Sequence, residues 1–195
     1  MRIFVAGASG VVGVPLVARL VAAGHDVAGM TRSAAKAAAL ADLGAQPVVC
    51  DVFDVEALIR AVVAFAPDAV IHELTDLPDE PDAIPQKAAA NSRIRREGTR
   101  NLIAAARAAG APRFLAQSVA FEVPGDGAEA VREHEAAVLA AGGVVLRYGH
   151  FYGPGTYHED EPAPPPAVHV GDAAARTVAA LEAPSGVLTI VDDGG

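Results

Sequence analysis

The stretch RIFVAGASGVVG, residues 2–13, decides the fold. Its apolar half predicts a buried strand, and apolar residues at helical spacing over 15–23 predict a helix directly after it. Between the two, Gly7 permits a tight turn, Gly10 lets a ligand approach the backbone, and Gly13 lets the helix pack closely on the strand. Backbone N–H groups at a helix N-terminus attract anions, so this unit predicts a phosphate-binding loop. A glycine-rich turn without a ligand is the alternative.

The chain then repeats the alternation of strand and helix. Ser33 and Asp54 stand where helix N-caps are expected. Further strands are predicted at 25–30, 46–50, 69–72, 113–118 and 143–147, and further helices at 33–43, 55–65, 86–109 and 128–141. Strands joined through helices by short connections pair in parallel with right-handed crossovers. The pattern predicts an α/β protein with a doubly wound parallel sheet and helices on both faces, the Rossmann fold.

The sequence changes in character after residue 150. An acidic, proline-rich loop is expected at 156–167, followed by a helix over 172–181 and a short strand over 186–191. We therefore expect a nucleotide-binding domain at 1–150 and a short C-terminal segment at 151–195, which completes that domain as a reduced lobe.

Composition excludes several classes of function. The formal net charge is −9, and no stretch gathers Lys and Arg, so nucleic acid is not an expected partner. The single cysteine, Cys50, rules out an intrachain disulfide and a multi-cysteine metal site, and we expect no bound metal. No apolar run is long enough to span a bilayer, and no export signal is visible. We expect a cytoplasmic protein with a small-molecule substrate and no membrane partner.

The end of the second strand bears on the choice of cofactor. Domains that prefer NAD usually place a carboxylate there to bind the ribose hydroxyls, but this chain has Thr31-Arg32-Ser33. Arg32 can pair with a ribose 2′-phosphate through charge-assisted hydrogen bonds, helped by the Ser33 hydroxyl. This favours NADP(H), with NAD still possible and a solvated surface arginine as the alternative. Asp51, after the third strand, can accept a hydrogen bond from the adenine amino group.

An ordered set of short motifs runs along the chain. They are Gly7-x-x-Gly10-x-x-Gly13, Asp51-Val52, the strand at 68–72, Asn91 with the GTRNL stretch at 98–102, Ser118 after the fifth strand, and Tyr152-Gly153-Pro154-Gly155. In this order they resemble the extended and atypical short-chain dehydrogenase/reductases, the NAD-dependent epimerase/dehydratase family. The resemblance implies that the two helices at 86–109 and 128–141 pair in a homodimer.

The resemblance also implies a set of site residues. Ser118 takes the place of the family's catalytic serine or threonine, with a strand-ending serine as the alternative. Residues implied at the cofactor are Gly7, Ser9, Gly10, Val11, Val12, Gly13, Arg32, Asp51, Val52, Leu74, Thr75, Gly149 and Phe151. Relatives usually carry a longer insertion where this chain has 156–167, so we expect an open cleft.

The family's catalytic Tyr-x-x-x-Lys pair is missing, because Gly127 and Val131 occupy the two positions. Glu73 and His150 are candidate acid–base residues in its place. His134 is interpreted as a surface histidine on a charged helix, with an acid–base role as the alternative. Tyr148 and Tyr152 are interpreted as packing residues whose hydroxyls are hydrogen-bonded, with replacement of the missing tyrosine as the alternative.

We therefore expect an NADP(H)-dependent oxidoreductase, epimerase or dehydratase-like enzyme acting on a small carbonyl or hydroxyl compound, with Ser118 polarising the substrate oxygen. Two alternatives stay open. One is a nucleotide-binding sensor or scaffold without catalysis. The other is a cofactor-independent isomerase or cyclase that uses Glu73 or His150.

Overall fold

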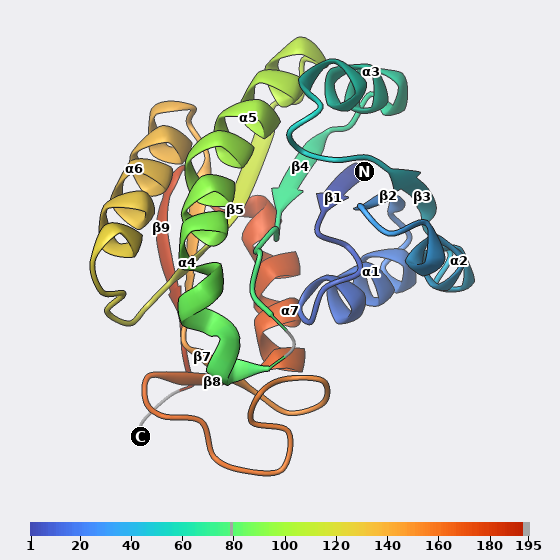
Figure 1. Cartoon of the computed structure of the whole chain (residues 1–195). Coiled ribbons are helices and arrows are strands. Elements are labelled where there is room, and N and C mark those ends of the chain that lie inside the picture. The colour runs from blue at the N-terminus through green and yellow to red at the C-terminus, as the bar shows by residue number, and fades with distance from the viewer. Residues whose placement is uncertain (79, 193–195) are drawn as a thin grey trace.

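The computed structural model describes residues 1–78 and 80–192, and a parallel sheet of seven strands forms its centre. The strands lie in the order β3-β2-β1-β4-β5-β6-β9 (Figure 1). Their bounds are β1 Arg2–Ala6, β2 Asp26–Thr31, β3 Gln46–Val49, β4 Ala69–His72, β5 Arg113–Val119, β6 Val144–Tyr148 and β9 Gly186–Ile190. The strand order reverses direction beside β1, which is the position where doubly wound sheets bind their ligands.

Helices cover both faces of this sheet. One face carries α1 (Gly13–Ala22), α2 (Ala34–Asp42) and α7 (Val170–Ala179), and the other carries α3 (Val55–Phe65), α5 (Thr99–Ala108) and α6 (Asp126–Ala140). The two groups of helices lie behind and in front of the sheet (Figure 1). This arrangement confirms the predicted fold class.

Two apolar cores follow from the period of two along each strand. Ile71 and Leu115 belong to the core under α1 and α7, whereas Val70 and Ala116, their neighbours in sequence, belong to the core under α3 and α5. Because both faces are buried, β1 is apolar over residues 3–6 and β4 over residues 69–71.

The helix expected at 86–109 begins earlier and changes its winding. It starts with the short 3₁₀ turn Pro81–Ala83, continues as α4 (Ile84–Arg93), passes through a π-helical turn at Ile94–Gly98 and ends as α5. The π turn brings the Arg95 side chain to a position where it is only 9% exposed. Such turns insert one extra residue and redirect side chains.

Two short strands were not predicted from the sequence. β7 (His150–Tyr152) and β8 (Ala167–His169) form a separate parallel pair, and the acidic loop connects them. Three residues are too few for a periodic signal. Beyond β8, α7 packs against α1, and the 3₁₀ turn Ala180–Glu182 leads to β9, which pairs with β6 in the main sheet.

The caps behave differently at the two predicted positions. The Asp54 side chain accepts a hydrogen bond from the Ala57 N–H at 3.0 Å and caps α3. Ser33 is the N-cap residue of α2, but its side chain makes no capping hydrogen bond. Within the described residues, no helix is long and apolar enough to cross a membrane.

Candidate cofactor and acid–base site

The glycine loop has no room for side chains at two of its three glycines. Gly7 has a φ of +90°, and a Cβ there would lie 2.6 Å from the carbonyl oxygen of Glu73. A Cβ on Gly13 would lie 2.2 Å from the Gly7 carbonyl oxygen, inside the van der Waals limit. The Gly10 N–H donates to that same oxygen at 3.0 Å and closes the turn. The loop is therefore held against the end of β4 by contacts that only glycine permits.

The N-terminus of α1 offers free donors beside this loop. In residues 1–78 and 80–192, the N–H groups of Val11 and Val12 have no hydrogen-bond acceptor, as expected at a helix start. The first turn of α1 carries no acidic residue that would oppose an anion. The loop thus fits the diphosphate of the dinucleotide that the sequence implies.

The end of β2 is tied to the glycine loop by hydroxyl groups. The hydroxyls of Ser9 and Thr31 are 2.9 Å apart, and Thr31 Oγ1 accepts a hydrogen bond from the Ser33 N–H at 3.2 Å. A hollow of about 200 Å³ adjoins Ser9 and is lined by Lys36 on α2 and by apolar side chains. Arg32 does not point freely into solvent, because its guanidinium donates to Asp76 Oδ1 at 2.9 Å.

The other residues implied at the cofactor follow the ends of parallel strands. Asp51 Oδ1 accepts from the Phe53 N–H at 2.9 Å, and the buried Val52 packs in the core under α3. Leu74 and Thr75 are partly buried after β4, while Gly149 is buried and Phe151 partly buried after β6. Because all strands of the sheet are parallel, these residues gather at one edge of it.

Glu73 lies in a buried chain of hydroxyl contacts. The residue is 6% exposed, and its side chain lies on the face of the sheet that α7 covers. The Tyr148 hydroxyl lies 3.1 Å from Glu73 Oε1 and 2.5 Å from Thr177 Oγ1, and Thr177 donates to the Ala173 carbonyl at 2.7 Å. When Glu73 carries a proton, each contact has one hydrogen: Glu73 donates to Tyr148, which donates to Thr177. When Glu73 is ionised, Tyr148 donates to Glu73, and Thr177 has one hydrogen for two acceptors.

Burial explains why Glu73 keeps its proton. Loss of hydration raises the pKa of Glu73 from 4.5 to about 8, and the hydrogen bond with Tyr148 opposes this only in part. Glu73 Oε2 is buried and has no hydrogen-bond partner in the described part of the chain. A neutral carboxyl group is compatible with a diphosphate nearby, whereas an ionised one would repel it.

Ser118 is held away from the cleft. It is 1% exposed, and its hydroxyl donates to Glu135 Oε1 at 2.6 Å. Arg147 donates to both oxygens of the same carboxylate, at 2.9 and 2.5 Å. Burial raises the pKa of Glu135, but the hydrogen bonds from Arg147 and Ser118 outweigh it and lower that pKa overall. The Ser118 hydrogen is thus committed to Glu135 in this conformation.

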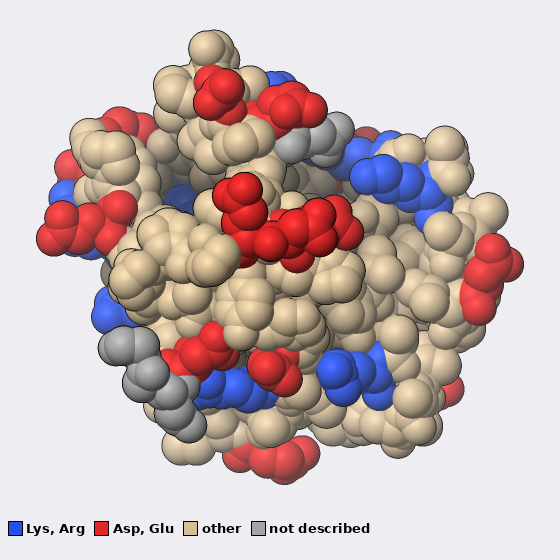
Figure 2. Space-filling model, turned by 90° about the horizontal axis from the view of Figure 1, so that it is seen from below, with Lys and Arg blue, Asp and Glu red and all other residues tan. Residues whose placement is uncertain are grey.

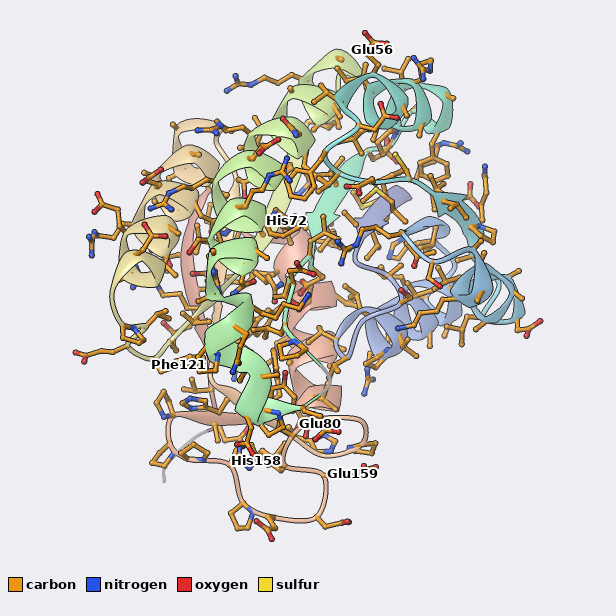
Figure 3. All side chains as sticks on the ribbon, viewed as in Figure 1. Glu56, His72, Glu80, Phe121, His158 and Glu159 are labelled. Atoms are coloured by element: carbon orange, nitrogen blue, oxygen red, sulfur yellow. The ribbon has the colours of Figure 1, made fainter. Side chains whose placement is uncertain are left out.

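His150 lies at the sheet edge and remains partly exposed. Its ring stacks on Phe121, with centroids 3.8 Å apart and an interplanar angle of 13°. Nδ1 lies 3.0 Å from the Pro164 carbonyl oxygen, so in the neutral ring Nδ1 carries the hydrogen and donates it. Nε2 is then the basic nitrogen. Phe121 follows β5 and lies toward the strands' carboxyl ends (Figure 3).

His134 corrects the sequence interpretation. It is 2% exposed and lies between α6 and α5, not on the surface. The Leu74 N–H donates to His72 Nδ1 at 3.1 Å, so the His72 Nε2 donates to Thr99 at 3.1 Å, and Thr99 donates to His134 Nδ1 at 2.7 Å. His134 Nε2 then donates to the Gln117 carbonyl at 2.9 Å. The acidic neighbours of His134 in sequence suggested an exposed position, but packing of α6 against α5 buries its ring.

The His72 and His134 rings in this series of hydrogen bonds are both neutral. Burial lowers the pKa of His134 to about 4, helped by the nearby charge of Arg95. Burial also lowers the pKa of His72 well below its usual value, with contributions from His134 and Arg95. His72 lies beside α5, at the end of β4 (Figure 3). These hydrogen bonds therefore link Leu74, on the connection after β4, to Gln117 near the end of β5.

The two tyrosines have partners, as expected. Tyr148 is 1% exposed and its hydroxyl is engaged as described. The Tyr152 hydroxyl donates to Asp192 Oδ2 at 2.9 Å. On α6, Gly127 and Val131 bring no acidic proton to the cleft, so the structure supplies no equivalent of the missing pair on that helix.

The acidic loop forms a separate surface. A hollow of about 510 Å³ lies there, away from the glycine loop, and is lined by Tyr152, Glu159, Asp160, Glu161, Pro162, Ala163 and Ala167. Acidic side chains gather at the centre of this face (Figure 2). The Tyr157 hydroxyl donates to the Pro78 carbonyl, so the loop reaches the connection after β4.

Sequence reasoning missed Asp76 and the partners of Glu73. Asp76 stands on the connection after β4, and its position after a parallel strand was the one available signal. Tyr148 meets Glu73 across a separation of 75 residues and Thr177 across one of 29, and nothing in the local sequence announces these contacts.

Comparison with known proteins follows the same outline. The model of the NAD dependent epimerase/dehydratase family matches residues 3–141. The chain belongs to this family. Among curated relatives of this epimerase/dehydratase member is a 3-diazoavenalumate denitrifying reductase from a Streptomyces species, 39% identical over 236 residues that cover 99% of this chain and 76% of the relative.

Solved structures show the same fold. The UDP-glucose 4-epimerase of Thermus thermophilus, in complex with NAD, has a TM-score of 0.83 and 22% identity, covering 100% of this chain and 79% of that one. ChuY, an anaerobillin reductase of Escherichia coli O157:H7, has a TM-score of 0.74 and 21% identity, covering 100% and 98%. The family and the 39% identical reductase place this chain among NAD(P)-dependent epimerases, dehydratases and reductases.

Proposed function

We propose that this epimerase/dehydratase family member is an NADP(H)-dependent oxidoreductase that acts on a small carbonyl or hydroxyl compound. The observation that carries the proposal is the glycine loop, where a Cβ on Gly7 or Gly13 would collide with backbone, while the N–H groups of Val11 and Val12 before α1 have no acceptor among the described residues. Arg32 follows Thr31, whose hydroxyl contacts Ser9 of the glycine loop, and this placement supports a 2′-phosphate contact. The reductase relative supports reduction over epimerisation.

The bound nucleotide supplies or removes a hydride at the substrate carbon. The chain must then exchange one proton at the substrate oxygen, and His150 is our candidate. Its Nδ1 is held by the Pro164 carbonyl and its ring by Phe121, which leaves Nε2 to exchange a proton with the substrate oxygen. His150 is the partly exposed member of the three predicted catalytic residues, so a substrate can reach it without a change in the core.

Glu73 and Ser118 take secondary places in this proposal. Glu73 holds a proton at a buried oxygen, and Tyr148 and Thr177 set its direction. Its role is to keep the β4 end uncharged. Ser118 can polarise a substrate oxygen only after its hydroxyl leaves Glu135. We therefore expect loss of Ser118 to affect stability before it affects turnover.

Titration with NADPH and NADH, followed by nicotinamide fluorescence, tests the cofactor. We expect both to bind, with NADPH tighter, and Arg32→Glu to weaken NADPH more than NADH. An equal loss of affinity for NADPH and NADH would refute the contact assigned between Arg32 and the 2′-phosphate. Binding of neither nucleotide would overturn the proposal and favour a cofactor-independent isomerase or cyclase.

Transfer of deuteride from stereospecifically labelled NADPH across a panel of carbonyl compounds tests catalysis. Stereospecific transfer is expected. Binding without transfer to any carbonyl would instead support the sensor or scaffold.

His150→Gln should lower kcat at least tenfold with little change in the NADPH Kd, and an unchanged kcat excludes His150 as the proton-exchanging residue. A homodimer through α4–α5 and α6, and a cytoplasmic location, belong to the same proposal, and sedimentation of the purified protein tests the first.

A further inference from the structure

An ion pair crosses the mouth of the glycine loop. The Arg32 guanidinium and Asp76 Oδ1 are 2.9 Å apart, and their side chains are 47% and 21% exposed. Arg32 follows β2 and Asp76 follows β4, and both strands pair directly with β1. The glycine loop continues from the end of β1, so the two side chains meet over it.

The two partners are positioned by different contacts. Arg32 lies between Thr31, whose hydroxyl is 2.9 Å from Ser9, and Ser33, whose N–H donates to that same Thr31 hydroxyl. The Asp76 N–H donates to Asn91 Oδ1 at 3.2 Å, so α4 fixes its backbone. Neither backbone depends on the ion pair, which leaves both side chains free to exchange partners.

The two side chains have opposite preferences for a ribose. A guanidinium favours a 2′-phosphate, whereas a carboxylate accepts hydrogen bonds from ribose hydroxyls and repels a phosphate. NAD-preferring domains place that carboxylate at the end of the second strand, where this chain has Arg32. Here Asp76 brings a carboxylate to the same place from the connection after β4. A 2′-phosphate that pairs with Arg32 must therefore approach Asp76 as well.

We propose that Asp76 is a specificity-determining residue: it accepts a hydrogen bond from the ribose 2′-hydroxyl of NAD(H) and opposes the 2′-phosphate of NADP(H). The chain then accepts both cofactors, and the balance between Arg32 and Asp76 sets their ratio. This inference rests on the proposed nucleotide binding. Lys36, which lines the neighbouring hollow, adds positive charge on the side of Arg32.

Dissociation constants for NADPH and NADH test the assignment in the wild type, Asp76→Asn, Arg32→Gln and the double variant. Asp76→Asn should tighten NADPH about tenfold, because a full charge near a phosphate is removed, and should leave NADH unchanged or up to about threefold weaker. Arg32→Gln should move the ratio in the opposite direction. Asparagine retains the side-chain shape, and the backbone contact with Asn91 is unaffected.

Glu56→Gln is the matched control, because it removes one exposed acidic charge on α3, far from the glycine loop (Figure 3). It should change neither constant. An equal change in both constants for Asp76→Asn means a structural role and overturns the specificity assignment, as does an unchanged ratio. Failure of the wild type to bind either nucleotide overturns the proposed function itself, and with it this assignment. Thermal unfolding of each variant without nucleotide separates folding defects from binding effects.

Discussion

Replacing Glu73 by Gln should make the protein more stable at alkaline pH, although substitutions at buried polar contacts usually destabilise the fold. The wild-type carboxyl group is buried, with Tyr148 as its hydrogen-bonding partner, and among residues 1–78 and 80–192 no positive charge lies against it. Glutamine has nearly the same shape and remains neutral. It can donate to Tyr148 as the protonated acid does, so the chain through Thr177 keeps its hydrogens.

The magnitude follows from the shift in pKa. The unfolded chain releases the Glu73 proton near pH 4.5, whereas the folded protein holds it until about pH 8. Between these values the folded state binds more protons, so the free energy of unfolding falls by about 1.4 kcal/mol per pH unit as the pH rises. The favourable contribution is complete below pH 4.5 and is lost once the pH passes 8. Glu73→Gln lacks this loss, so the variant-minus-wild-type difference should grow by about 3.5 kcal/mol from pH 5 to pH 8.

Urea unfolding of both proteins at pH 5, 6.5 and 8 measures this difference, in which the titration of all other groups cancels. Glu56→Gln, at an exposed position, should show no growing difference. A difference that stays constant with pH, or one that shrinks, would show that Glu73 ionises normally in the folded state and would refute the argument from burial.

Three further substitutions test local features. Gly13→Ala places a Cβ 2.2 Å from the Gly7 carbonyl oxygen; urea unfolding should show a loss of about 3 kcal/mol, and nucleotide titration a loss of affinity. Asp54→Ala removes the cap of α3 and should cost about 1 kcal/mol by thermal unfolding. Glu135→Gln weakens the contact with Arg147, and urea unfolding should show a loss of about 2 kcal/mol in the free energy of unfolding. The loss should be smaller above about 0.5 M salt. An unchanged free energy of unfolding would show that solvent replaces that contact.

The order of elements was predictable because the chain is locally consistent. The run at 2–13 contains a strand, a turn that requires glycine and the start of a helix, each with its own signal. The same holds for Asp54, whose capping contact lies three residues away. The predicted boundaries of most elements therefore differ from those of the structure by one or two residues, and the helix expected at 86–109 is the exception, because its first turn begins at Pro81.

The chemistry of the site was less predictable, because it depends on contacts between distant segments. His134 has acidic residues on both sides in sequence, which is typical of a surface helix, yet its ring packs against α5. Ser118 was predicted to end the fifth strand and lies one residue before the end of β5, where Glu135 on α6 takes its hydrogen. Arg32 has the residue type that a phosphate site needs, and only the fold places Asp76 against it.

The buried chain from Leu74 through His72, Thr99 and His134 has a direction, since each member gives its hydrogen to the next. A proton added to His72 would set its Nδ1–H against the Leu74 N–H, whereas a proton added to His134 Nδ1 would reverse its contact with Thr99, so that the Thr99 hydroxyl accepts from both rings. Acid therefore acts on a polar link that three elements share: the end of β4, helix α5 and helix α6. The connection after β4 and the packing of the two helices thus share one hydrogen-bond network, and Leu74 should lose amide protection when His72 takes up a proton, at a pH well below the usual pKa of histidine.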